Sequence, residues 1–198
     1  MYYYSSEKTW ENSFWLGYPT LKCPLDMWIY QEILCKIQPE VIIETGTYCG
    51  GSTLYLAMIC DMLKKGDIIS IDVEEIKERP FHPRIKYFQG SSIATDTIKI
   101  VKHFISARKK IMVILDSDHS KKHVLQELKI YSQFVDVSSY LIVEDTDFNG
   151  HPVKPEFGPG PMEAVEEFLK SNPHFSIDYS REKLLLTQNP KGYLKRIS

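Results

Sequence analysis

The sequence predicts a single α/β domain in which a mostly parallel sheet is flanked by helices. Short apolar runs rich in Ile and Val alternate with segments whose apolar residues recur at helical spacing. These runs lack the polar alternation of a sheet with one solvated face, so their strands are expected to be buried on both faces. A glycine-rich turn at 46–52 joins the first of them directly to a helix. This order is typical of βαβ units.

The elements follow one another in regular alternation. A first helix is expected at 24–37, then a strand at 41–45 and a helix at 52–65 that Gly66 closes, as glycine does at helix C-termini. The remaining expected elements are strands at 68–72 and 85–89, a helix at 96–108, a strand at 111–116, a helix at 120–133, a strand at 140–144, and a helix at 161–171 opened by proline. Two short strands are expected near Phe175 and Leu185.

The 198 residues, 43% of them hydrophobic, can bury one sizeable core, and no Pro-, Gly- or Ser-rich linker divides them. We therefore expect one domain over residues 21–198, preceded by an aromatic-rich arm over residues 1–20. The arm is interpreted as a lid, as a contact with a second subunit in a homo-oligomer, or as an ordinary terminus.

Charge and cysteine usage narrow the class of partner. The 24 basic and 26 acidic residues offer no case for nucleic acid or for an anionic membrane surface. No apolar run is long enough to span a bilayer, and the four cysteines form no C-x-x-C pair. The sequence thus favours a cytoplasmic protein with free thiols that acts on small molecules.

The turn after the first strand is expected to bind a ligand. Its glycines, Gly46, Gly50 and Gly51, let the backbone approach a bound molecule, and amides at the start of the next helix face it. The spacing is G-x-x-x-G-G with Glu44 ahead of it, not the G-x-G-x-x-G of pyrophosphate-binding dehydrogenases, so NAD is disfavoured.

Other strand ends carry polar residues suited to a nucleoside. In such sheets ligands bind beyond the carboxyl ends of the strands. Asp72 ends the second strand, where an acid can accept hydrogen bonds from ribose, and Ser91 and Ser92 after the third strand would flank adenine. The alternative is that Asp72 caps the turn before Glu74 and that the serines are loop residues.

Four acids follow the next two strands: Asp116, Asp118, Glu144 and Asp145. Carboxylates pressed together repel unless a cation neutralises them, and an all-oxygen set favours a hard ion such as Mg²⁺. Alternatively, Asp116 or Asp118 caps the helix that starts near Ser120. We expect both roles to occur among these acids.

Several separated motifs carry a family resemblance. The turn Gly46-Thr47-Tyr48-Cys49-Gly50-Gly51-Ser52 is similar to that of the catechol O-methyltransferase group. The segments 115–120 (LDSDHS), 140–146 (YLIVEDT), 149–153 (NGHPV) and 158–165 (GPGPMEAV) resemble the cephalosporin hydroxylase family. Despite its name, that family contains Mg²⁺-dependent enzymes that bind S-adenosylmethionine (SAM) and are related to antibiotic and sugar O-methyltransferases. The resemblance covers residues 21–186.

The resemblance implies a Rossmann-like SAM-dependent methyltransferase fold with a seven-stranded sheet, and it implies two ligand sets. SAM would lie beside Glu44, Gly46, Tyr48, Gly50, Ser52, Asp72, Ser91, Ser92 and Asp116. Mg²⁺ or another divalent cation would be held by Glu144 and Asp145 together with a third acid. An overlay on the catechol O-methyltransferase pattern selects Asp116, whereas the family's own pattern is also compatible with Asp118.

Two histidines are candidate bases. The same overlay places His119 where catechol O-methyltransferases carry a catalytic lysine, and imidazole accepts a proton near neutrality more readily than an amine does. His151, in the loop after the metal acids, is the second candidate. Either could instead be a loop histidine that bonds to the backbone.

The predicted function is Mg²⁺-dependent transfer of a methyl group from SAM to a hydroxyl of a sugar or of a secondary metabolite such as an antibiotic precursor. One alternative is a metal-dependent hydroxylase, although Fe(II) oxygenases usually need two histidines and a carboxylate, whereas this set is rich in carboxylates. Another is a non-catalytic partner protein that binds SAM.

Overall fold

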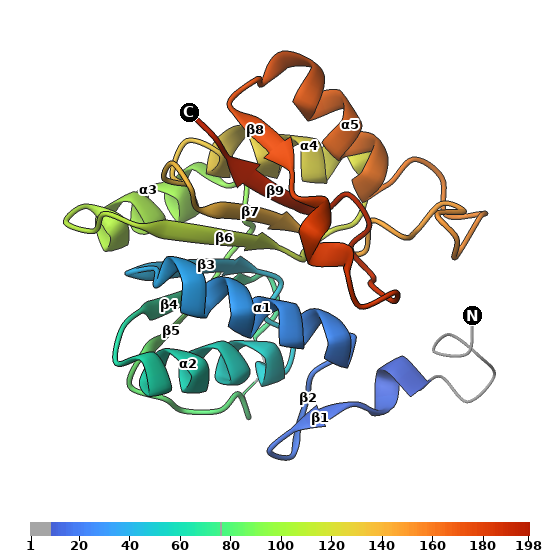
Figure 1. Ribbon diagram of the computed structural model, residues 1–198. Helices are drawn as coiled ribbons and strands as arrows, with labels where there is room; N and C mark the ends of the chain where they lie inside the picture. Colours follow the sequence, from blue (N-terminus) through green and yellow to red (C-terminus); the bar gives the residue numbers. More distant parts are fainter. Residues whose placement is uncertain (1–8, 76) are drawn as a thin grey trace.

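A seven-stranded sheet forms the centre of the computed structural model, which describes residues 9–75 and 77–198 (Figure 1). The strand order is β5-β4-β3-β6-β7-β9-β8. The strands are β3 (Val41–Thr45), β4 (Asp67–Asp72), β5 (Ile85–Gln89), β6 (Ile111–Leu115), β7 (Tyr140–Val143), β8 (Phe175–Ile177) and β9 (Tyr193–Arg196). β9 runs antiparallel to β7 and β8, and the pairs from β5 to β7 are parallel. The expected mostly parallel sheet is confirmed.

Helices cover both faces of this sheet (Figure 1). α1 (Pro24–Ile37) and α2 (Gly51–Leu63) pack on one face, and α3 (Thr95–Ile105), α4 (Lys121–Tyr131) and α5 (Pro161–Ser171) pack on the other. Proline opens both α1 and α5, where its missing N–H and fixed φ suit the first helical turn. The result is a three-layer α/β arrangement.

Each central strand feeds two hydrophobic cores. In β3, Val41 and Ile43 join the core beneath α3, α4 and α5, whereas Ile42 joins the core beneath α1 and α2. β6 repeats the pattern, and every residue of both strands is buried. Successive side chains on a strand point to opposite faces, so burial on both faces demands the continuous apolar runs seen in the sequence.

The chain reverses its direction of winding between β3 and β6. β4 lies on one side of β3 and β6 on the other, so the loops that leave β3 and β6 diverge and open a crevice at the carboxyl edge of the sheet. Gly46 lies at this point with φ +85°, and a Cβ there would be 1.8 Å from the carbonyl oxygen of Asp116. Only glycine fits, so the two loops approach closely here.

The strand expected near Leu185 was wrong. Leu185 is fully exposed, with φ +66°, and it follows the 3₁₀ turn η3 (Tyr179–Glu182). The last strand is instead β9, which inserts between β7 and β8. The cluster of leucines at 184–186 resembles a strand locally, but pairing with β7 selects the later segment.

Part of the N-terminal arm is ordered against the domain. It forms a 3₁₀ turn η2 (Thr9–Asn12) and a small hairpin of β1 (Phe14–Trp15) with β2 (Tyr18–Pro19). The Trp15 ring packs edge-on against Tyr55 of α2, with centroids 4.9 Å apart. Residues 1–8 of the predicted arm lie outside the described residues.

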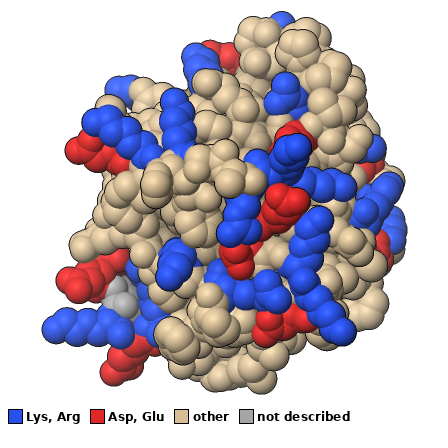
Figure 2. All heavy atoms as spheres, turned by 90° about the vertical axis from the view of Figure 1, so that its left-hand side faces the viewer, with Lys and Arg blue, Asp and Glu red and all other residues tan. Residues whose placement is uncertain are grey.

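Among the described residues, neither the helices nor the surface charges indicate a membrane-spanning or strongly charged protein. Over residues 9–75 and 77–198, no helix has the length and apolarity needed to cross a bilayer. On the face in Figure 2, basic and acidic side chains are intermixed, as the near balance of 24 and 26 charges leads one to expect.

Glu44 ties the glycine turn to its neighbours, and its removal is expected to destabilise the fold. Its buried carboxylate accepts hydrogen bonds from Ser52 (2.7 Å), Ser70 (2.6 Å) and Thr53. The Glu44→Ala variant leaves three buried hydroxyls without their acceptor, so we expect a loss of about 2–3 kcal/mol in the free energy of unfolding. Urea denaturation would measure it, with the exposed Glu78→Ala as the matched control. Equal stability of the two variants would contradict this role.

Candidate active site

A cavity of about 800 Å³ lies at the carboxyl edge of the sheet, over the crevice between β3 and β6. This volume is in the range of sites that hold a small-molecule ligand. Most of the predicted site residues line it: Gly46, Tyr48, Ser52, Asp72, Ser91, Ser92, Asp116, Asp118, His119 and Asp145. Residues from five strand ends and the N-terminus of α2 are thereby brought together.

Four predicted site residues are not among those that line this cavity. Glu44 bonds to the hydroxyls described above, and Gly50 caps α2 with φ +79°. Glu144 is buried beside Lys22. His151 lies 2.8 Å from the Glu163 carboxylate, between its Nε2 and Oε1 atoms. Glu44 and Gly50 therefore shape the turn rather than the cavity wall.

At one end of the cavity Asp72 forms the turn cap that was the alternative expectation, and its hydrogen bonding to ribose stays a prediction. Its Oδ1 accepts a hydrogen bond from the Glu74 amide (2.9 Å), which is the turn cap. Its Oδ2 accepts one from the Tyr48 amide (2.7 Å) and lies 3.4 Å from the Arg79 guanidinium. The carboxylate thus links β4 to the glycine turn, and it remains at the cavity wall.

His123, which the sequence analysis did not select, joins the predicted adenine end. Its Nε2 lies 3.0 Å from the Ser92 hydroxyl and 3.6 Å from the Glu127 carboxylate. The hydrogen bond with Glu127 raises the pKa of His123, although burial opposes the shift. No sequence signal singles out this histidine, because its partner Ser92 lies 31 residues away.

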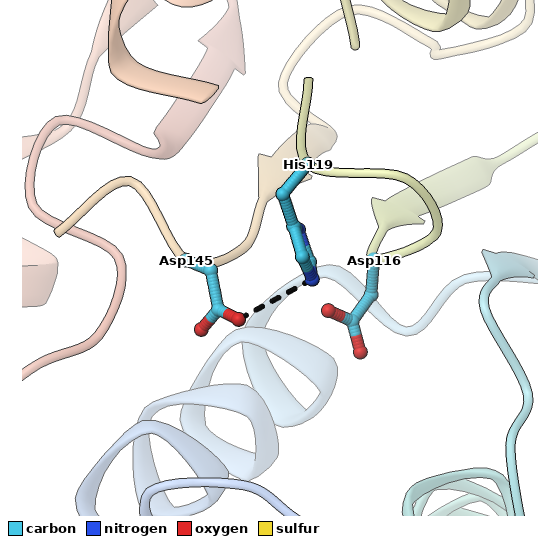
Figure 3. A group of neighbouring side chains, drawn as sticks. All are labelled: Asp116, His119 and Asp145. Carbon is cyan, nitrogen blue, oxygen red and sulfur yellow. Dashed lines mark ion pairs between the residues drawn. The ribbon is translucent and has the colours of Figure 1, made fainter. Parts of the chain in front are cut away.

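At the other end, Asp116, His119 and Asp145 converge (Figure 3). Figure 3 shows the imidazole pointing between the two carboxylates, and its Nε2 lies 3.4 Å from Asp145 Oδ2. One ligand atom from each residue lies within 4.8 Å of the others. Two carboxylates from adjacent strand ends at this spacing fit the demands of a divalent cation.

Lys22 is the main site residue that the sequence analysis missed. Its ammonium contacts Asp116 Oδ2 and lies 2.6 Å from Glu144 Oε1. Burial opposes the charge of Lys22, but the two carboxylates outweigh it and raise the Lys22 pKa. Burial in turn raises the pKa of Glu144 and of Asp116, against the opposing charge of Lys22. A lysine 94 residues before its partner carries no motif signal.

Asp118 is not the cap of α4, because the N-cap is Ser120, whose hydroxyl accepts a hydrogen bond from the His123 amide (3.4 Å). Asp118 Oδ1 accepts a hydrogen bond from the Ser120 amide (2.7 Å), just ahead of α4. That bond lowers the pKa of Asp118. The carboxylate lies at the cavity wall but outside the group formed by Asp116, His119 and Asp145.

An aromatic wall borders the His119 side of the cavity. Phe148 packs edge-on against the His119 ring (5.3 Å between centroids) and against Phe157 (5.1 Å). The Lys154 ammonium lies 3.7 Å from the centroid of Phe148 and 5.6 Å from that of Trp10. Phe157 comes from the loop that leads into α5.

The fold is of the Rossmann-like α/β class, with a glycine turn at the switch point and acidic strand ends beside it. The model of the rhamnosyl O-methyltransferase/CmcI family matches residues 7–197. The chain belongs to this family, as the sequence motifs led us to expect.

Curated relatives and solved structures agree with this assignment. The chain is 36% identical to the rhamnosyl O-methyltransferase of Mycobacterium leprae (strain TN), over 98% of this chain and 87% of the relative. It is 37% identical to that of Mycobacterium tuberculosis (strain ATCC 25618 / H37Rv), over 98% and 82%. A CmcI structure with Mg and SAM matches with a TM-score of 0.70 at 18% identity, over 95% of this chain and 78% of that one. An apo CmcI structure gives 0.71 at 21%, over 95% and 77%. The expected fold is thereby confirmed.

Proposed function

We propose that this protein is a SAM-dependent O-methyltransferase that uses Mg²⁺, or another divalent cation, and acts on a sugar hydroxyl. The observation that carries the proposal is the placement of Asp116, His119 and Asp145 in the same cavity as the glycine turn. A proton acceptor and two carboxylates therefore stand beside a nucleoside-type site. The rhamnosyl O-methyltransferases at 36–37% identity support the same reaction class.

The cofactor would be held by residues along the first half of the cavity. When bound, SAM supplies an electrophilic methyl group. The N-terminus of α2 would hold its amino-acid part, because the free amides at a helix start favour a carboxylate, and Gly46 and Tyr48 would border it. Asp72 would accept hydrogen bonds from ribose, and Ser92 with His123 would border the adenine.

Of the two aspartates left open by the motifs, we assign Asp116 and not Asp118 to the metal. Asp116 and Asp145 present carboxylates within the span of one ion, whereas Asp118 is engaged at the start of α4. When bound, a divalent cation supplies Lewis-acid polarisation of the acceptor hydroxyl. Glu144 stays a predicted ligand, although its carboxylate here faces Lys22.

His119 would take the proton of the acceptor hydroxyl on Nε2. That nitrogen points into the space between Asp116 and Asp145 (Figure 3). Asp145 Oδ2, 3.4 Å away, would stabilise the imidazolium that forms, and Phe148 holds the ring from the side. His151 bonds to Glu163 instead, so we assign the base to His119.

The acceptor would lie against the aromatic wall of Phe148, Phe157 and Trp10. Apolar lining with a few convergent polar groups is the usual composition of small-molecule sites, and a sugar offers C–H faces to the rings and hydroxyls to His119. We favour a rhamnosyl-type sugar, on the strength of the curated relatives. A hydroxyl of another secondary metabolite is the alternative.

Calorimetric titration and a methyl-transfer assay test the proposal together. We expect SAM to bind the purified protein, Asp72→Ala to weaken that binding at least about tenfold, and Mg²⁺ to stimulate methylation of a rhamnosyl glycoside. The exposed Glu78→Ala is the matched control. Absence of SAM binding would refute the proposal, and O₂-dependent turnover with Fe(II) and without SAM would restore the hydroxylase alternative.

A further inference from the structure

The buried ammonium of Lys22 occupies the position of a cation between two acids of the site. Lys22 lies in the segment between β2 and α1, and its side chain is only 5% exposed. It contacts Asp116 and Glu144, whose side chains are 21% and 2% exposed. A buried lysine is normally tolerated only with such partners. Here those partners are acids that the motifs assign to a metal.

The position of the ammonium matters because the same carboxylates serve both cations. Lys22 Nζ lies 2.6 Å from Glu144 Oε1, and Mg²⁺ binds carboxylate oxygens at about 2.0–2.1 Å. Glu144 does not belong to the group formed by Asp116, His119 and Asp145. For Asp116, Glu144 and Asp145 to bind one ion together, the Lys22 ammonium would have to leave its position between Asp116 and Glu144.

We propose that Lys22 is an internal cation that competes with the divalent ion for Asp116 and Glu144, and so weakens metal binding. This inference rests on the metal site of the proposed function. Without metal, Lys22 neutralises the two buried acids and keeps the strand ends of β6 and β7 together. With metal, like charges a few ångströms apart repel, so binding of the ion requires the ammonium to move away. Lys22 is a positioning residue in this scheme and does not touch the reacting atoms.

Metal affinity measured directly tests the competition. We expect Lys22→Met, which keeps the length of the side chain and removes its charge, to bind Mn²⁺ and Mg²⁺ at least about tenfold more tightly than the wild type in calorimetry. Lys22→Arg, which keeps the charge, should not gain affinity. Lys183→Met is the matched control, because Lys183 pairs with Glu32 at the surface (2.6 Å). Unchanged or weaker metal binding by Lys22→Met would overturn the proposal.

A second measurement on the wild-type protein covers the case in which Lys22→Met does not fold, since it leaves two buried acids without their partner. Brief acetylation with acetic anhydride, read by mass spectrometry, should modify Lys22 several-fold faster with saturating Mg²⁺ than without it. Lys183 should react equally in both. No acceleration at Lys22 in a protein that binds Mg²⁺ would overturn the competition alone. A protein that binds SAM but neither Mg²⁺ nor Mn²⁺, in wild type and variants, would remove the metal site and this proposal with it.

Discussion

The Asp145→Ala variant is expected to lose about a thousandfold in the turnover of methyl transfer. Asp145 lies at the end of β7, beside both His119 and Asp116, and it combines two proposed roles as metal ligand and as partner of the imidazole. Removal of one preorganised charge at a reacting centre costs about 10²–10³ in turnover, and loss of the metal adds to that. Steady-state kinetics at saturating SAM and acceptor would measure the effect.

The comparison with Asp118→Ala makes this result specific. Asp118 lies in the same cavity, but its carboxylate is engaged by the Ser120 amide just ahead of α4, so its removal should cost about 1 kcal/mol of stability, the value of one hydrogen bond, and leave turnover within a few-fold of the wild type. SAM affinity should be preserved in both variants, because the cofactor residues lie at the other end. A thousandfold loss in Asp118→Ala with an active Asp145→Ala would reverse the assignment of the acids.

The His119→Ala variant is expected to lower turnover by about 10²–10⁴, the usual range for removal of a general base. The proposed proton acceptor Nε2 points between the two carboxylates. His151 is held by Glu163, and His123 lies at the other end of the cavity, beside Ser92. The KM for the acceptor should change much less than turnover, because the aromatic wall that would hold it remains. The measurement is turnover at saturating substrates.

Chemical rescue separates a base from a structural histidine at this position. Added imidazole should restore part of the activity of His119→Ala, since the side chain is removed from the wall of a cavity that opens to solvent. His151→Ala should retain activity and lose only some stability through Glu163. Full activity of His119→Ala, or inactivity of His151→Ala at unchanged stability, would move the role of base to His151.

The spacing of apolar residues along the chain predicted most helices and strands, and the strand that it misplaced has a physical cause. α1 occupies 24–37 as expected, and β3, with all five residues buried, matches the predicted run at 41–45. The strand placed near Leu185 failed because local leucine content does not decide which segment pairs with β7. A strand forms where it can pair with its neighbours, and the partner strand β7 is distant from β9 along the chain, with Leu141 opposite Leu194.

Residue types and their order along the chain were sufficient to predict the fold, the family and the set of candidate acids. Gly46 is required by the approach of Asp116, and acids at strand ends meet because parallel strands end at one edge. Tertiary structure alone decided the direction in which each side chain points and what it meets there. In the folded chain Glu44 bonds to three hydroxyls, and Asp118 accepts a hydrogen bond just ahead of α4. His151 bonds to Glu163, and Lys22 lies between Asp116 and Glu144. A buried charge pairs with an opposite charge that the packing brings close to it. Sequence spacing cannot predict such a pair when its members are 94 residues apart, as Lys22 and Asp116 are.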